Sequence, residues 1–297
     1  MMVCQLASGI WQISKLVWGC LCAPLAVPID CMLKPYAALH TWGPDMSQQQ
    51  KRDEILQLTR TLGEPHREYV IIGEGNTSCR IDDDAFFIKA SGQQMETITA
   101  DGFVAVNFEP VLALLDNPPD TYSEIKRISN EARVDPSVSV VPSVEVTFHA
   151  MLLHECQVDW VGHTHPVAVN KLLCSNRAEA FAKNRTCPDE AVVCGPESVF
   201  VPYEDPGLPL AIVMRDKVRE YMDAYGEAPK VILLKNHGMI ALGQTPTEVR
   251  NITAMCVKGA HIVVGAYQVG EPVFLSREVI LHITNRPDEI YRRSQFV

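Results

Sequence analysis

The chain has 297 residues, and with 47% apolar and 21% charged residues it has the composition of a globular protein with a sizeable core. Its formal net charge at pH 7 is -10, and it contains no cluster of lysine and arginine that would bind a nucleic-acid backbone or an anionic membrane. We therefore expect no nucleic-acid partner and no membrane partner.

The ten cysteines are not spaced as a disulfide framework. Four of them, Cys4, Cys20, Cys22 and Cys31, lie close to the N-terminus, and the others are scattered without a C-x-x-C pair. Free thiols in a reducing compartment fit this distribution best, so we expect a cytoplasmic protein.

Residues 1–45 differ in character from the rest of the chain. The apolar run at residues 16–29 is shorter than the roughly 20 residues needed to cross a bilayer, and it contains two prolines. A signal peptide, and with it a secreted or membrane-tethered protein, is an alternative, although no small-residue cleavage site follows the run. At Met46 an ordinary helix begins with a serine cap. We expect residues 1–45 to be a non-functional leader or a misassigned start, and residues 46–297 to be the functional domain with a C-terminal tail.

A chain that starts at Met46 is therefore expected to fold, assemble and react like the full chain, because every motif described below lies downstream of that residue. Circular dichroism, solution mass and activity, measured on both chains, check this expectation. Unfolding or insolubility of the shorter chain would show instead that the apolar run at residues 16–29 packs on the domain.

From Met46 onward, helical and extended patterns alternate. Apolar residues at helical spacing predict a helix that ends at Gly63, and further helices are expected at residues 110–115, 143–154 and 246–268. Four segments read as strands that end in turns: YVIIGEG (69–75), AFFIKASG (85–92), DWVGHTHP (159–166) and KVILLKNHGMIALG (230–243). Residues 117–120 read as a surface loop. The expected architecture is a sheet flanked by helices.

The candidate chemistry concentrates in the HTHP motif. Residues two apart on a strand project from the same side, so His163 and His165 can reach one ion. An H-x-H pair alone is weak evidence, because neighbouring histidines are common on ordinary surfaces. His237 supplies a third imidazole where an apolar strand enters a glycine turn. Three imidazoles with an open position are typical of a catalytic zinc site, and Mn²⁺ or Co²⁺ suit the same ligands.

A carboxylate accompanies these histidines. Glu145, in VPSVEVTFHAMLL, falls in the first turn of a helix that is otherwise apolar on its inner face, where an acid is costly unless it is paired or placed at a site. The alternative is that Glu145 caps the helix after Ser143 and lies in water. His149 follows one helical turn later and can hydrogen-bond Glu145, whereas His154 is expected at an exposed helix end.

Five motifs, in the order GEGNTSCR, KASG, PSVEVTFH, GHTHP and KNHGMIALG, cover most of residues 50–270 and resemble the class II aldolase and adducin family. This family includes fuculose-phosphate and rhamnulose-phosphate aldolases and ribulose-phosphate 4-epimerase. The resemblance implies an α/β fold, an α/β/α sandwich around a mixed, largely antiparallel sheet. It also implies a homotetramer with active sites at subunit interfaces. It assigns the metal to His163, His165 and His237, and it makes Glu145 both a ligand of the free metal and a proton carrier.

The resemblance also maps the family's anion pocket onto this chain. The residues that would bind a substrate phosphate are Gly75, Asn76, Ser91, Gly92 and Ser143. Val144 stands where the sugar-phosphate members have a second serine, so one hydroxyl donor is missing and phosphate binding is in question. Lys89 would favour a carboxylate if it faced the pocket. We expect its side chain to point to solvent instead.

Together these groups predict a metal-dependent carbon–carbon lyase that acts on a small sugar or sugar phosphate. The expected reaction is retro-aldol cleavage of a ketose or hydroxyketone through a metal-stabilised enediolate, with Glu145 as the proton carrier. Epimerisation and decarboxylation of a 3-oxo acid use the same enediolate and remain alternatives.

Two questions stay open at this point. The segment after HTHP lacks the tyrosine that the sugar-phosphate aldolases supply from an adjacent subunit, and Tyr203 and Tyr291 are substitutes for which packed or surface positions are the simpler expectation. The second question is whether the chain is a non-catalytic scaffold, like the adducin head domains. Loss of metal ligands would indicate a scaffold, and retention of all three histidines and the glutamate favours catalysis.

Overall fold

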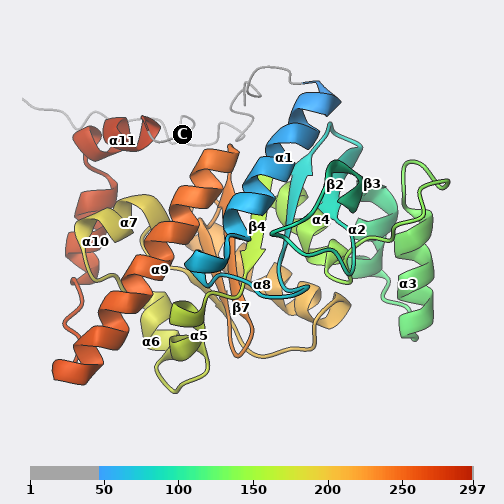
Figure 1. Cartoon of the computed structure of the whole chain (residues 1–297). Helices are drawn as coiled ribbons and strands as arrows, with labels where there is room; N and C mark the ends of the chain where they lie inside the picture. Colours follow the sequence, from blue (N-terminus) through green and yellow to red (C-terminus); the bar gives the residue numbers. More distant parts are fainter. Residues whose placement is uncertain (1–46, 296–297) are drawn as a thin grey trace, which may run out of the picture. The chain divides into compact units, whose positions relative to one another are not determined.

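The computed structural model describes residues 47–295 (Figure 1). The leader predicted at residues 1–45 lies outside the described residues, as does the start at Met46. All cysteines of the described part are free, as predicted, and they are Cys79, Cys156, Cys174, Cys187, Cys194 and Cys256.

A mixed seven-stranded sheet with the order β3-β2-β1-β4-β7-β6-β5 forms the middle of the described part. Every neighbouring pair is antiparallel except β5 and β6, which run parallel. The sheet is therefore mixed and largely antiparallel, as predicted. The strands are β1 Asn76–Arg80, β2 Ala85–Lys89, β3 Phe103–Asn107, β4 Trp160–Thr164, β5 Val199–Val201, β6 Val231–Leu234 and β7 Gly238–Gly243.

Helices cover both faces of this sheet (Figure 1). One face carries α1, α5 and α9, and the other carries α2, α4 and α8, so the predicted α/β/α sandwich is confirmed. The helices are α1 Gln48–Leu62, α2 Phe108–Asp116, α3 Tyr122–Glu131, α4 Val146–Glu155, α5 Val167–Leu173, α6 Ala178–Lys183, α7 Pro188–Cys194, α8 Leu208–Tyr225, α9 Pro246–Val269, α10 Arg277–Thr284 and α11 Pro287–Ser294, with the short 3-10 helices η2 Pro65–Arg67 and η3 Ala100–Gly102.

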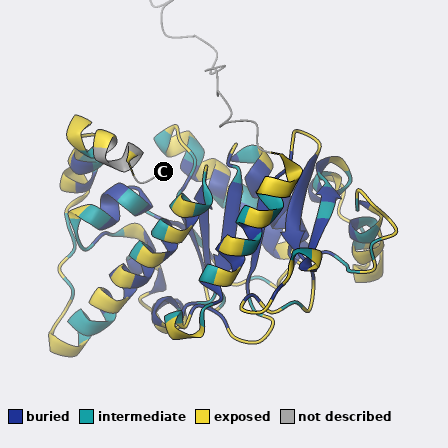
Figure 2. Cartoon of the chain, turned by 45° about the horizontal axis from the view of Figure 1, so that its top comes forward, coloured by how far each residue is buried: buried dark blue, intermediate teal, exposed yellow. Residues whose placement is uncertain are grey.

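The sheet separates two hydrophobic cores, and the alternation of side chains along β4 decides which residue enters each core. Trp160 belongs to the core beneath α1, α5 and α9, and Val161 to the core beneath α2, α4 and α8. In Figure 2 the strands are largely buried, and the helices that cover them are exposed on their outward side. His163, two residues after Val161, therefore faces α4, where its ring meets the ring of Phe148 edge-on at 5.6 Å between centroids.

The segment YVIIGEG, predicted as a strand, is instead an irregular loop between η2 and β1. Ile72 has a left-handed backbone with φ 53°, which breaks an extended run, and both Ile71 and Ile72 are exposed. The strand begins only at Asn76. An apolar run predicts a strand only if its side chains find a core, and these two isoleucines do not.

The segment KVILLKNHGMIALG, predicted as one strand, is a hairpin of β6 and β7. The chain reverses at Asn236, whose backbone is left-handed with φ 56°, a conformation that asparagine tolerates better than most residues. His237 consequently lies in the turn between the two strands. The other predicted strands are confirmed as β2 and β4, and the helices at residues 110–115 and 246–268 as α2 and α9.

Within residues 47–295, one helix, α9, is long and apolar enough to cross a bilayer by length and composition. The core helices of soluble proteins can have the same length and apolar composition, so this feature does not indicate a membrane span. α9 buries Val249, Ile252 and Cys256 and packs against β4, β7, α1 and α5. It is a core helix of the sandwich.

Candidate metal and acid-base site

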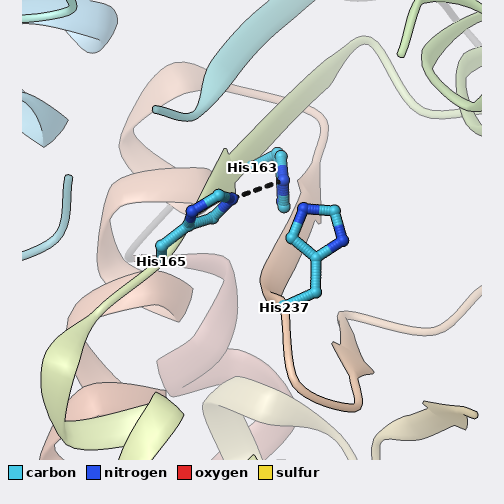
Figure 3. A group of neighbouring side chains, drawn as sticks. All are labelled: His163, His165 and His237. Carbon is cyan, nitrogen blue, oxygen red and sulfur yellow. Dashed lines mark hydrogen bonds between the residues drawn. The ribbon is translucent and has the colours of Figure 1, made fainter. Parts of the chain in front are cut away.

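Three histidines converge at one end of β4 (Figure 3). His163 lies on β4 and His165 directly after it, while His237 reaches them from the turn between β6 and β7. The three ring centroids are 4.8 to 4.9 Å apart, and one nitrogen from each ring lies within 4.8 Å of the others. The predicted cluster is thus present, and its donor atoms are close enough to bind one metal ion.

Strand pairing and a glycine bring the turn to the histidines. β7 pairs with β4 so that Ile240 lies opposite His163, which sets the start of β7 beside the end of β4. A Cβ atom on Gly238 would lie 2.5 Å from the Thr164 carbonyl oxygen and 2.7 Å from the His165 ring. Only glycine allows this close approach of the turn to the strand end.

Polar contacts at Nδ1 of two of the imidazoles direct their Nε2 atoms to one point. Nδ1 of His163 donates to the Met239 carbonyl oxygen at 3.0 Å, and Nδ1 of His165 lies 3.7 Å from the Glu74 carboxylate. Their Nε2 atoms face each other at 3.0 Å (Figure 3). Burial lowers the pKa of both rings to about 3, so both are neutral at pH 7. Neutral imidazoles with oriented Nε2 lone pairs fit a divalent cation.

Glu145 is buried at this cluster, at the N-terminal end of α4. One carboxylate oxygen lies 3.4 Å from Nε2 of His237, and the other lies 3.5 Å from Nε2 of His163. Its side chain makes no capping hydrogen bond, so the alternative of a solvated cap is wrong. Burial raises the pKa of Glu145, and the neighbouring His237, the hydrogen bond from Asn76 and the charge of Lys89 oppose that increase.

His149 does not bond the Glu145 carboxylate, and that prediction is wrong. Its ring contacts the side chains of Asn76 and Ser78 on β1 instead, and burial lowers its pKa well below the usual range. The cause is packing, because α4 lies across β1 and presents His149 to the sheet. His154 is exposed, as predicted.

Lys89 is buried as well, which corrects the expectation that it points to solvent. Its Nζ donates to the Gln93 carbonyl oxygen at 2.6 Å, and burial lowers its pKa to about 8 against the opposing charge of Glu145. The KASG turn curls back over the end of β2, and this places a backbone acceptor within reach of the ammonium group.

The chain is similar to known proteins over most of its length. A family model described as Class II Aldolase and Adducin N-terminal domain matches residues 53–264. The chain belongs to this family. It is also similar to YuxG of Bacillus subtilis, named an uncharacterized oxidoreductase, with 25% identity over 218 residues, 69% of this chain and 29% of that protein. The chain thus spans less than a third of that relative's length.

Solved structures of class II aldolases share the fold. The N-terminal class II aldolase domain of a conserved protein from Thermoplasma acidophilum has 24% identity and a TM-score of 0.58, covering 75% of this chain and 98% of that one. An L-fuculose 1-phosphate aldolase has 19% identity and a TM-score of 0.60, covering 82% and 98%. Membership of the family supports a sugar-processing function of the lyase or epimerase type.

The residues predicted to bind a substrate anion come from three segments: the turn at Gly75 and Asn76, the KASG turn, and the segment that carries Ser143. A bridge between Ala90 and Pro142 places the KASG turn beside the segment that carries Ser143. Gly75, with φ +67°, precedes Asn76 in a crowded turn, because a Cβ atom there would lie 2.7 Å from the His163 carbonyl oxygen. Their binding of a substrate anion stays a prediction.

One group at the site and one contact within it were not predicted from the sequence. Glu74, in the loop before β1, faces Nδ1 of His165, and its only sequence signal is its place in the GEGN motif. The link between Asn76 and His149 joins residues far apart in the chain and has no local signal. Of the two candidate tyrosines, Tyr203 is exposed and donates to Asp205, and Tyr291 is exposed on α11.

Proposed function

We propose that this protein is a metal-dependent carbon–carbon lyase that cleaves a ketose or hydroxyketone by a retro-aldol reaction. The observation that carries the proposal is the position of Glu145, whose two carboxylate oxygens lie 3.5 and 3.4 Å from Nε2 of His163 and His237. A buried acid beside a set of neutral imidazoles suits proton transfer at a cation site.

His163, His165 and His237 would hold the cation, for which we propose Zn²⁺, with Mn²⁺ and Co²⁺ as alternatives. When bound, the cation supplies Lewis-acid stabilisation of negative charge on substrate oxygens. The neutral rings, their aligned Nε2 atoms and a neighbouring carboxylate that can complete the coordination support this choice.

Glu145 would move one proton at the substrate carbon. Cleavage breaks a carbon–carbon bond, releases an aldehyde and leaves the electron pair on the ketone fragment as an enediolate. Glu145 then gives its proton to the enediolate carbon, and in the reverse direction its carboxylate removes that proton. The raised pKa suits this role, because burial favours the protonated form of the carboxyl group. Tyr203 and Tyr291 remain candidates for the second proton-transfer group, which acts on the hydroxyl at the cleaved bond.

Retro-aldol cleavage is tested with matched phosphorylated and free ketoses, including L-fuculose 1-phosphate and L-fuculose, by coupled detection of the aldehyde. The proposal expects cleavage that is lost on chelation and restored by Zn²⁺. Epimerisation or loss of CO₂ from a 3-oxo acid, measured on the same preparation without cleavage, would replace this proposal by one of the alternatives on the same site. Absence of all three reactions in metal-loaded protein would favour the adducin-like scaffold.

The proposed assembly and metabolic role follow from the family resemblance, and the proposed compartment follows from the free cysteines. We propose a homotetramer in the cytoplasm that takes part in carbohydrate metabolism, with a small sugar or sugar phosphate as its partner. Solution mass by light scattering tests the assembly: a mass four times the 33.0 kDa of the chain supports it, and a monomer contradicts it.

The anionic end of the substrate is probed at Val144, a half-exposed residue between Ser143 and Glu145. We expect Val144→Ser to raise kcat/KM for phosphorylated ketoses about fivefold, because a restored hydroxyl bond is worth about 1 kcal/mol. Free or carboxylated ketoses should not respond. A gain that is limited to phosphorylated ketoses would indicate that the natural substrate lacks a phosphate. A parent protein that already strongly prefers phosphorylated ketoses would contradict this prediction.

A further inference from the structure

A line of hydrogen bonds leads from strand β1 to the candidate acid. Oγ of Ser78 lies 2.6 Å from Nδ1 of His149, and Nε2 of His149 contacts Oδ1 of Asn76. Nδ2 of Asn76 then lies 2.7 Å from a carboxylate oxygen of Glu145. All four residues are buried, His149 and Ser78 completely. Water therefore does not compete for these bonds, and losing one leaves a buried group without its partner.

The direction of each bond follows from the chemistry of the groups. An amide nitrogen only donates, so the Asn76 nitrogen faces the carboxylate and the Asn76 oxygen faces His149. That oxygen only accepts, so Nε2 of His149 carries the ring proton, and Nδ1 accepts from the hydroxyl of Ser78. If the Asn76 amide were rotated by 180°, its oxygen would face the Glu145 carboxylate, so that two acceptors would meet. Its nitrogen would face the Nε2 proton of His149, so that two donors would meet.

Asn76 has no amide hydrogen left for a substrate anion. Its nitrogen also lies 3.1 Å from Oγ of Ser143, and the same oxygen accepts the backbone N–H of Glu145 at 3.3 Å. Strand register places the amide at the site, because Asn76 pairs with His163 across β1 and β4. The amide is thus bonded on three sides within the protein.

We propose that His149, acting through Asn76, is a positioning residue that holds the Glu145 carboxylate beside the histidine cluster. The inference rests on the proposed function, in which Glu145 carries the proton. It assigns Asn76 to orienting the acid, in place of the anion binding that the sequence predicted. Ser78 fixes the ring of His149 from the other side, so the orientation of the acid is set from within the sheet.

Two substitutions at position 149 separate positioning from packing. His149→Gln keeps a donor near the place of Nε2, whereas His149→Asn is one methylene shorter and keeps a polar group only near the place of Nδ1. His154→Asn, at an exposed position on the same helix, is the matched control. Thermal unfolding of each full-length variant shows whether it folds. If His149→Asn does not fold, Ser78→Ala takes its place, because it removes only the hydroxyl that fixes the ring.

The probe reaction is exchange of a carbon-bound hydrogen of dihydroxyacetone phosphate with D₂O, run in parallel with free dihydroxyacetone and followed by proton NMR. The C–H bond beside the carbonyl breaks, Glu145 takes the proton, and the electron pair moves to the carbonyl oxygen. Return of a deuteron to the same carbon completes the exchange. This reaction isolates the proton transfer from carbon–carbon bond cleavage.

We expect His149→Asn to lower kcat for exchange roughly 10-fold to 100-fold while KM stays within about threefold, since an unbonded amide turns away from the acid. Ser78→Ala should lower kcat about threefold to 10-fold. His149→Gln should recover activity to within about threefold of the parent, and His154→Asn should match it. Equal losses of activity in His149→Gln and His149→Asn would overturn the inference. A raised KM with unchanged kcat would also overturn it, and this is the result expected if Asn76 binds the substrate anion.

Nitrogen-15 NMR of the histidine rings and of the Asn76 side-chain amide tests the same inference without turnover. Positioning expects the Nε2–H form of His149, and displaced Asn76 amide resonances in His149→Asn but not in His149→Gln. An Nδ1–H form, or unmoved amide resonances, contradicts it. The proposed function fails if the parent protein exchanges the hydrogen of neither compound, or if Glu145→Gln exchanges it as fast as the parent. In that case the NMR result alone decides whether His149 positions Glu145.

Discussion

Glu145→Gln is expected to lower kcat about 100-fold to 10,000-fold while the protein keeps its metal. The amide preserves the shape of the side chain and cannot carry a proton, and general acid-base catalysis contributes a factor of that size. The three histidines remain to bind the cation. Turnover of the fastest-cleaved ketose and metal content by elemental analysis, on one preparation, measure both effects.

A matched control for this variant is Glu109→Gln, because Glu109, like Glu145, lies at the start of a helix but is exposed. It should keep the activity of the parent. Full activity in Glu145→Gln would remove Glu145 from the mechanism. Loss of metal together with activity would show that the carboxylate is needed as a ligand, so the proton-transfer role would then lack support.

His163→Ala and His237→Ala are each expected to weaken metal binding by more than about 100-fold, since even changes in groups that only orient a ligand cost 10-fold to 100-fold. The parent should contain about one divalent ion per chain when it is purified without chelators. Titration with Zn²⁺, followed by thermal unfolding, checks the affinity, because a ligand that binds only the folded state raises the unfolding temperature.

His261→Ala controls for the loss of a histidine as such, because His261 lies exposed on α9. It should leave metal content unchanged. If both cluster variants kept full metal occupancy, the three histidines would not be the metal site. A chain that binds no divalent ion in any form would contradict the metal-dependent lyase as a whole.

Local patterns predicted most of the secondary structure, and they failed where a turn depended on its surroundings. AFFIK and WVGHT form the strands that their residues favour, because each is paired with a neighbouring strand on both sides. YVIIGEG is equally apolar but has left-handed residues and exposed isoleucines. KVILLKNHGMIALG reverses at Asn236, where β7 returns to pair with β4 and β6. A single apolar run does not reveal which strand its residues will pair with.

The sequence by itself determined the fold class and the family through its five motifs, and it placed His163 and His165 together, because a strand presents alternate side chains on one side. The pairing of β7 with β4 then brings His237 to them. Only the tertiary structure decided the partners of the buried polar groups. His149 lies within helical reach of Glu145, yet its ring bonds Asn76 and Ser78, which are 73 and 71 residues away. The reason is that a buried polar group bonds whichever partner the packing of helix on sheet brings within reach, and such a partner has no fixed separation along the chain.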